Sequence, residues 1–172
     1  MSKKLFLSSV LFPVLILLAS GSVFTAPAQK SKTATQQKSG KIVIEYVSFP
    51  DVFKQYDVYP WETMNVEDFR EAYKEMLGPK RREEWVGSLT GTGDRNRMIH
   101  VFSEHILLIT GCKPYACDTS QLIVLFSPLS KKCFALSATE GKFEWLGNPD
   151  ERTKNLLKVL LVEEFREAYK AR

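Results

Sequence analysis

The sequence predicts an α+β fold in which helices pack on one antiparallel β-sheet. Five apolar runs rich in β-branched and aromatic residues lie between residues 97 and 147, and only short gaps separate them. Amphipathic helical patterns occupy residues 65–79 before these runs and residues 151–170 after them. Strands gathered in one stretch of sequence, with helices outside it, are typical of α+β proteins rather than of alternating α/β folds.

The N-terminus has the pattern of a secretory signal peptide. Lys3 and Lys4 form a basic start, and an apolar stretch then runs to Leu18. Ala26 and Ala28 occupy the small-residue positions before a cleavage site. The apolar stretch is short for a membrane span of about 20 residues, so we expect cleavage rather than a retained membrane anchor.

This pattern divides the chain into three parts. Residues 1–28 are expected to be removed on export to the periplasm. Residues 29–41 are polar and basic without apolar spacing, which predicts a flexible leader. Residues 42–172 are long enough for a single folded domain with its own core. The net charge of +4 is too small to indicate nucleic acid as a partner.

The first part of the domain is predicted to combine one strand with one helix. Residues 41–47 predict a strand, and residues 48–62, which contain two prolines, predict an irregular connection. Residues 65–79 predict a helix that Asn65 caps and that ends at Gly78 and Pro79. The apolar stripe of this helix consists of Phe69, Tyr73, Met76 and Leu77.

The second part is predicted to form the sheet and a terminal helix. Residues 83–86 are too short to assign, and residues 90–94 predict a turn. The helix at 151–170 has one broad apolar face, which favours packing across a sheet. The five strands are predicted at 97–102, 105–111, 121–127, 133–139 and 142–147. The apolar face of the last helix consists of Leu157, Leu160, Leu161, Phe165, Ala168 and Tyr169, and Leu156, Val159 and Val162 widen it.

Three cysteines occur in the chain, and two of them flank a short turn, "CKPYAC". Export makes disulfides permissible, and Cys112 and Cys117 are close enough to pair. Cys133 then remains free or pairs with another molecule. The spacing is neither the C-x-x-C of thiol oxidoreductases nor half of a zinc site with a second pair. We therefore expect a structural disulfide that contributes about 2 kcal/mol through loop closure.

The ring between these cysteines has two interpretations. Pro114 fixes one more backbone dihedral, so the ring holds its tip in one shape and displays Lys113 and Tyr115 between two strands. A rigid projecting loop avoids an ordering cost on binding, which is how protein inhibitors gain affinity. The alternative is a hairpin turn that is merely stapled. The residues themselves leave both interpretations open.

No spacing in the chain indicates an enzyme, a metal site or a cofactor. His100 and His105 resemble the metalloprotease H-x-x-E-H pattern with one extra residue, but on a strand they would point to opposite faces. The Gly-Thr-Gly at 91–93 lacks the strand–loop–helix setting of a nucleotide site. We expect a protein without catalytic activity, and neither a metal nor a cofactor.

The segment "GCKPYACDTSQLIVLFS" is followed by "FALSAT", "FEWLG" and a terminal apolar helix. Together these segments resemble the Ivy family, the periplasmic inhibitors of vertebrate lysozyme. The helix and the Trp-Val and Gly-Thr segments before them are also similar to that family, so the resemblance covers about residues 65–165. It implies a curved antiparallel sheet of about five strands with helices packed on one side.

The resemblance also implies an inhibitory loop, Lys113, Pro114, Tyr115 and Ala116, that enters the active-site cleft of C-type lysozyme. The family form of the loop is C-K-P-H-D-C, so Cys112, Lys113, Pro114 and Cys117 match it directly. Tyr115 stands in place of the family's His, and Ala116 in place of its Asp. The family His bonds both catalytic carboxylates, whereas one phenol hydroxyl contacts only one of them.

These departures from the family loop keep other functions in view. One is a non-inhibitory envelope protein that binds an endogenous lytic transglycosylase, another peptidoglycan-cleaving enzyme, or peptidoglycan itself. Another, from a different class, is a redox or hydrolytic enzyme of the envelope. A homodimer is an assembly that the sequence leaves open. An inhibitor of host lysozyme would help a bacterium to evade host defence.

Overall fold

The computed structural model describes residues 42–79 and 83–170. These residues belong to the compact unit that spans residues 40–172. The predicted signal peptide and the polar leader lie outside the described residues. None of the described helices is long and apolar enough to cross a membrane.

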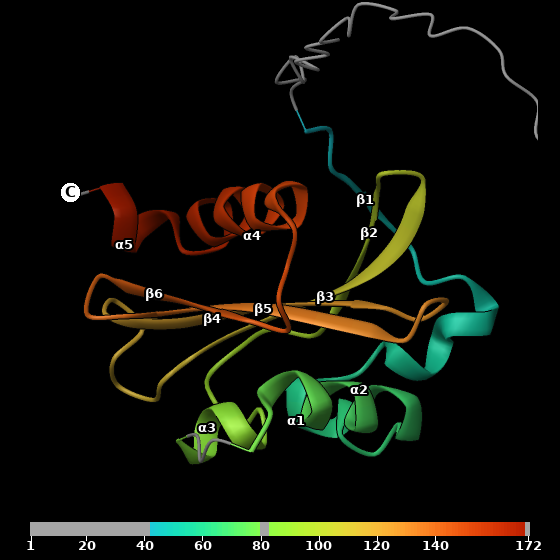
Figure 1. Ribbon diagram of the computed structural model, residues 1–172, viewed down its shortest axis with the longest axis horizontal. Coiled ribbons are helices and arrows are strands. Elements are labelled where there is room, and N and C mark those ends of the chain that lie inside the picture. Colours follow the sequence, from blue (N-terminus) through green and yellow to red (C-terminus); the bar gives the residue numbers. More distant parts are fainter. Residues whose placement is uncertain (1–41, 80–82, 171–172) are drawn as a thin grey trace, which may run out of the picture. The chain divides into compact units, whose positions relative to one another are not determined.

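A six-stranded antiparallel sheet forms the centre of the fold (Figure 1). Each strand pairs with the next strand in the sequence, which confirms the predicted meander. The strand predicted at 41–47 is present as the edge strand beside β2, so the sheet has six strands, whereas the family resemblance implies about five. The strands are β1 (Glu45–Val47), β2 (Arg97–Val101), β3 (Glu104–Cys112), β4 (Ser120–Ser127), β5 (Lys132–Thr139) and β6 (Lys142–Leu146).

The sheet separates two hydrophobic cores. All eight residues of β4 are buried, so both faces of this central strand are covered. Because side chains alternate along a strand, Leu122 and Val124 enter one core while Ile123 and Leu125 enter the other. A strand buried on both faces reads as a continuous apolar run, as this one does.

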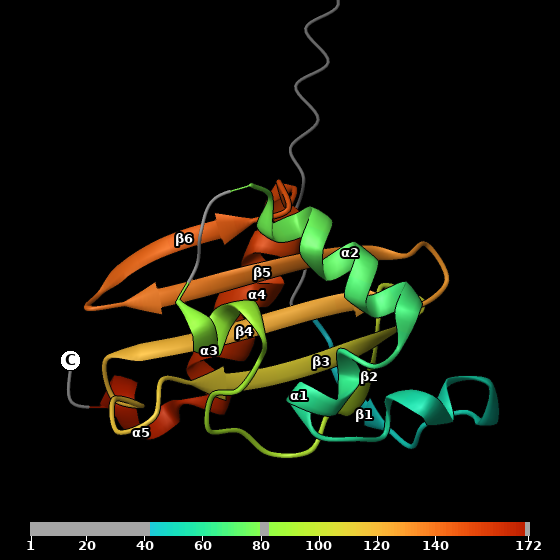
Figure 2. The same cartoon turned by 90° about the horizontal axis from the view of Figure 1, so that it is seen from below.

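Helices α1 (Pro60–Thr63), α2 (Glu67–Leu77) and α3 (Glu84–Gly87) cover one face of the sheet (Figure 2). Phe69 and Tyr73 of α2 are fully buried there, and the Phe69 ring meets the Phe126 ring edge-on at 5.3 Å. The 3₁₀ helix η1 (Asp51–Tyr56) adds Tyr56 to the same core.

Helices α4 (Glu151–Glu164) and α5 (Arg166–Lys170) cover the opposite face (Figure 1). The four buried leucines of α4, at positions 156, 157, 160 and 161, pack on the sheet as predicted. Val159 and Val162 are exposed, so the apolar face is narrower than expected. The expectation of helices on one side is wrong: with apolar side chains on both faces of β4, the sheet requires a helical layer on each face.

Three local predictions also differ from the structure. The helix α2 begins after Val66, and Asn65 lies one residue before that position, so Asn65 is not its cap. The predicted C-terminal helix is interrupted at Phe165, where the backbone leaves the helical region. The connection at 48–62 contains η1 and α1, because Pro60 starts a helical turn in which a Glu62 carboxylate accepts the Tyr59 backbone N–H.

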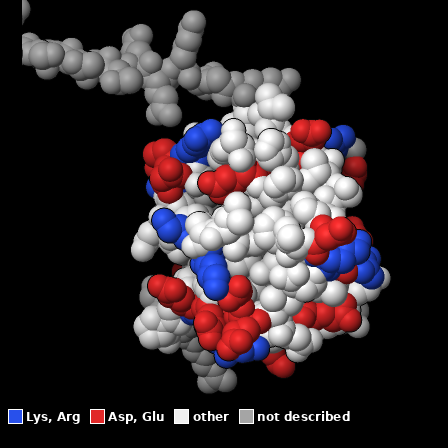
Figure 3. Space-filling view, turned by 90° about the vertical axis from the view of Figure 1, so that its right-hand side faces the viewer, with Lys and Arg blue, Asp and Glu red and all other residues white. Residues whose placement is uncertain are grey.

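Charges on the surface are mixed in sign. On the face of the molecule in Figure 3, acidic and basic side chains lie beside one another around a centre with few charges. Two of the surface ion pairs join Lys131 to Asp68 at 2.8 Å and Lys154 to Glu151 at 2.6 Å. Exposed pairs of this kind contribute little to stability.

Candidate functional site

The β3–β4 connection forms a closed ring at one end of the sheet. Cys112 is the last residue of β3, and a disulfide joins it to Cys117 with 4.9 Å between the Cα atoms. The predicted pairing is therefore present in the structure. Cys133 is a free cysteine. It is buried, and this burial raises the pKa of its thiol.

Tyr115 occupies the apex of the ring. Its side chain is fully exposed, and its backbone has a φ of 64°, in the left-handed region that bulky residues rarely adopt. Such a conformation costs about 1–2 kcal/mol in a non-glycine residue. The hydrogen bond from the Ala116 N–H to the Lys113 carbonyl, at 2.9 Å, closes the turn that imposes it. The ring thus presents one large aromatic side chain away from the rest of the molecule.

The C-terminal side of the ring is anchored by side chains and by main chain. The Ala116 carbonyl accepts the backbone N–H groups of Thr119 and Ser120, at 3.1 and 2.8 Å. The Gln121 amide donates to the Cys117 carbonyl at 2.6 Å and accepts the Tyr169 hydroxyl at 3.2 Å. Helix α5 therefore supports the base of the ring from the other side of the sheet.

The N-terminal side of the ring is anchored by the segment that precedes β2. The backbone groups of Thr92 and Cys112 exchange two hydrogen bonds, of 2.9 and 2.8 Å. A Cβ on Gly91 would lie 2.5 Å from the Cys112 carbonyl, and a Cβ on Gly93 would lie 2.3 Å from the Thr110 carbonyl. The predicted turn at 90–94 is therefore wrong: both glycines permit close backbone approach to β3.

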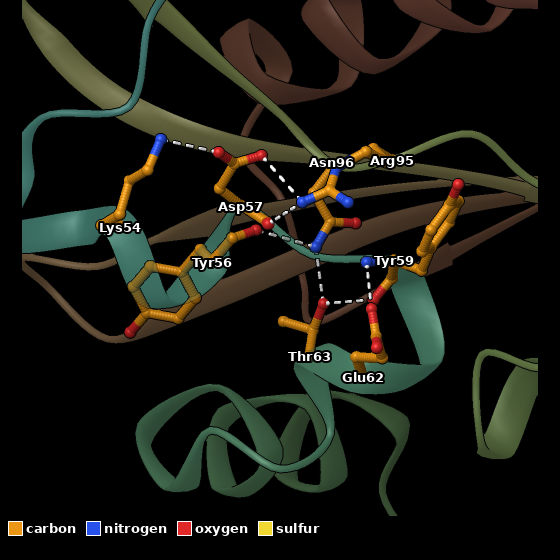
Figure 4. Close-up of polar contacts among 8 residues, drawn as sticks. All are labelled: Lys54, Tyr56, Asp57, Tyr59, Glu62, Thr63, Arg95 and Asn96. Carbon is orange, nitrogen blue, oxygen red and sulfur yellow. Dashed lines mark hydrogen bonds and ion pairs between the residues drawn. The ribbon is translucent and has the colours of Figure 1, made fainter.

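Asn96 anchors the end of the segment between Thr92 and β2 (Figure 4). This buried residue donates from its backbone N–H to the Val58 carbonyl at 2.9 Å. Its side-chain amide donates to the Tyr56 carbonyl at 3.1 Å and to the Thr63 hydroxyl at 2.6 Å. The guanidinium of Arg95 adds a hydrogen bond to the carbonyl of Asp57. The support of the ring is thus tied to η1 and α1.

Lys113 does not project from the apex as expected. Its ammonium lies 2.8 Å from a carboxylate oxygen of Glu83, the residue before α3. The same carboxylate accepts the indole N–H of Trp85 at 3.3 Å. Sequence reasoning missed Glu83, because β2 and β3 lie between Glu83 and the loop in the sequence and the two segments share no motif. Tyr115 therefore stands alone as the projecting group of the ring.

The two histidines also lie differently from the expectation. They were expected on opposite faces of one strand, but a turn between them places His100 on β2 directly opposite His105 on β3. Their ring centroids are 5.3 Å apart. The strands predicted at 97–102 and 105–111 already implied this hairpin, and the expectation failed because it treated both histidines as residues of one strand.

One family model matches the chain, and its description is "Inhibitor of vertebrate lysozyme (Ivy)". The match covers residues 68–161, which is more than half of the 172 residues. It includes most of α2, the strands β2 to β6 and the disulfide ring. The chain belongs to the Ivy family. No curated protein matches it. The Ivy assignment confirms the family resemblance, and it is a family of inhibitors rather than of enzymes.

Proposed function

We propose that this Ivy-family protein inhibits C-type lysozyme by inserting the ring between Cys112 and Cys117 into the active-site cleft. The observation that carries the proposal is the position of Tyr115. It is fully exposed at the apex of a disulfide-closed ring, and the base of that ring is held by Thr92 and by Gln121. A projecting group on a rigid base loses little conformational freedom when it binds.

The chemistry of the lysozyme cleft suits a phenol. Lysozyme cleaves its substrate with two carboxyl groups that flank the scissile bond. The Tyr115 hydroxyl can donate one hydrogen bond to an ionised carboxylate, and a charge-assisted hydrogen bond contributes about 1.5–3 kcal/mol. The ring of Tyr115 would also bury apolar area between the walls of the cleft.

Lys113 has a second part in the proposal. In the free protein its ammonium faces Glu83, and in the complex a carboxylate of the enzyme competes for the same ammonium. Since both pairings satisfy the charge, the net gain from Lys113 on binding is small. We therefore assign most of the binding energy of the ring to Tyr115, which has no such exchange to make.

The location proposed for the protein is the periplasm. The N-terminal signal pattern directs export, and a disulfide between Cys112 and Cys117 is stable in an oxidising compartment. Cleavage after Ala28 would leave no membrane anchor. In this location the protein would meet lysozyme that reaches the cell wall from outside.

An alternative function is favoured by the two departures from the family loop. Tyr115 and Ala116 replace a His and an Asp, and one hydroxyl does not reach two carboxylates as an imidazole does. A relative with this loop would bind a different peptidoglycan-cleaving enzyme, such as an endogenous lytic transglycosylase, or peptidoglycan without inhibition. The projecting ring could enter the cleft of a lysozyme or of a lytic transglycosylase, because both enzymes cleave the same glycan.

The experiment compares these partners directly. The purified protein is titrated against a C-type lysozyme, another type of lysozyme and a lytic transglycosylase, with peptidoglycan turnover as the readout. The main proposal predicts inhibition of the C-type enzyme at the lowest protein concentration. Inhibition of the transglycosylase alone would favour the alternative, and binding to peptidoglycan without any inhibition would contradict both inhibitory proposals.

A further inference from the structure

The β2–β3 hairpin brings together the only two histidines of the chain. His100 and His105 are directly opposite each other, with 5.3 Å between ring centroids and an angle of 43° between ring planes. Both rings are partly exposed to solvent. Two imidazoles this close, on neighbouring strands, resemble a pair of ligands to one metal ion.

The pairing pattern of the hairpin explains why the rings are so close. Phe102 and Ser103 form a two-residue turn with φ values of 56° and 67°. In such a hairpin the residues next to the turn, Val101 and Glu104, form a hydrogen-bonded pair. The next pair, His100 and His105, is then a non-hydrogen-bonded pair, in which side chains approach most closely.

A third side chain supports His100. Glu45 of β1 pairs in register with His100, and its Oε2 lies 4.0 Å from the Nδ1 of that imidazole. The ring of His105 has an aromatic neighbour, Phe53, whose ring centroid lies 6.4 Å from its own. The separation between Glu45 and His100 is longer than a hydrogen bond. Imidazoles that bind metals commonly donate their other ring N–H to a carboxylate, and Glu45 is the carboxylate nearest to Nδ1 for this role.

We propose that His100 and His105 bind one divalent transition-metal ion, such as Zn²⁺, with Glu45 as the positioning carboxylate. Neutral imidazole is a good ligand for zinc, copper and nickel, and a poor one for magnesium and calcium. Within residues 42–79 and 83–170 no group of three His, Cys, Asp or Glu side chains is placed to hold a metal ion. The proposed site thus has only two ligands from the protein, the two imidazoles, and water would complete the coordination shell.

This site is separate from the proposed inhibitory ring. His105 is near the start of β3 and Cys112 is at its end. Seven residues of antiparallel strand span about 24 Å, so an ion at the hairpin does not contact the ring. Metal binding and lysozyme inhibition can therefore fail independently of each other.

The test uses the full chain without a polyhistidine tag, titrated with Zn²⁺ while NMR follows the imidazole signals. We expect both imidazoles to shift together and to saturate at one ion per chain. In His105→Asn the His100 signal should need at least tenfold more Zn²⁺, and His100→Asn should behave alike. Mg²⁺ should leave both signals unchanged.

Two carboxylate variants complete the test. Glu45→Gln removes the positioning charge and should raise the Zn²⁺ concentration at half-saturation about tenfold. Glu104→Gln is the matched control, because it makes the same change at the first residue of β3, where the Glu104 carboxylate accepts the Ser127 hydroxyl. It should bind Zn²⁺ as the parent does. Imidazole signals that stay unmoved by Zn²⁺, or binding that survives both His→Asn variants, would overturn the proposal.

Discussion

The ammonium of Lys113 lies 2.8 Å from the carboxylate of Glu83, which joins the disulfide ring to the start of α3. The hydrogen bond from Lys113 is the main cause that lowers the pKa of the Glu83 carboxyl, and the Trp85 indole lowers it further. A lowered pKa means that the ionised Glu83 stabilises the folded protein. This stabilisation is present above pH 4.5, the ordinary pKa of the group, and is lost as the pH falls through the lowered pKa.

This pair predicts the effect of Glu83→Gln. The change frees the Lys113 ammonium for a carboxylate of the bound enzyme, so inhibition should strengthen by up to about fivefold, the range of an exposed ion pair. Glu84→Gln is the matched control, since Glu84 is the next residue and has no ion pair with Lys113. Inhibition constants measured at pH 7 decide the matter. Weaker inhibition by Glu83→Gln would mean that the pair shapes the ring rather than competing with the enzyme.

The disulfide should matter for inhibition more than for folding. Replacing Cys112 and Cys117 by Ser should lower the free energy of unfolding by about 2 kcal/mol. Inhibition should weaken as well, because the open loop must be ordered on binding. Cys133→Ala keeps the ring and should inhibit as the parent does. Mass spectrometry of a non-reduced digest should find Cys112 linked to Cys117, and a link from Cys133 to either would contradict the ring.

Asn96 should be the residue whose loss most weakens the support of the ring. Asn96→Ala leaves the Tyr56 carbonyl and the Thr63 hydroxyl without their amide donor inside the core. An unsatisfied buried polar group costs about 1–3 kcal/mol, so the free energy of unfolding should fall by about 2 kcal/mol or more. Asn155→Ala, on the exposed side of α4, should show no such fall in a denaturant titration.

The start of α4 predicts a pH effect. The Asp150 carboxylate accepts the Thr153 backbone N–H at 2.8 Å. The interaction with the Thr153 side chain is the largest cause that lowers the pKa of Asp150, and this backbone hydrogen bond is the next. The cap therefore stabilises the protein above pH 3.8, the ordinary pKa, and loses strength as the pH falls through the lowered value. Asp150→Ala should cost about 1 kcal/mol at pH 7. Asp150→Asn retains a capping side chain, so its melting temperature should depend less on acid than the parent's.

Much of the fold was readable from the sequence because its signals are local. The alternation and turn spacing of the strands gave the meander, and the apolar faces of α2 and α4 gave both helices. The apolar run at residues 122–126 in β4 also held the evidence for two helical layers, since a strand that is buried on both faces is apolar at successive positions. The placement of the helices on both faces and the cap of α2 were predicted less accurately, because they depend on tertiary packing.

The candidate site was predictable only in part. The spacing of Cys112 and Cys117 gave the ring directly. The partners of the ring, Glu83 and Thr92, are set by how distant segments pack, and no local pattern marks them. The histidine pair was missed for a different reason. His100 and His105 were treated as residues of one strand, although the separate strands predicted at 97–102 and 105–111 place them on neighbouring strands.

The central claim is that Tyr115 inhibits lysozyme, and inhibition constants for Tyr115 variants against a C-type lysozyme test it most directly. Tyr115→Phe keeps the ring and removes the donor, so inhibition should weaken about tenfold or more. Tyr115→Ala should weaken it further, because the buried ring area is also lost. Tyr115→His with Ala116→Asp should strengthen it by restoring a contact with both carboxylates. Melting temperatures should stay nearly unchanged, since the residue is exposed. If all three variants inhibit as the parent does, the ring is not the inhibitory element.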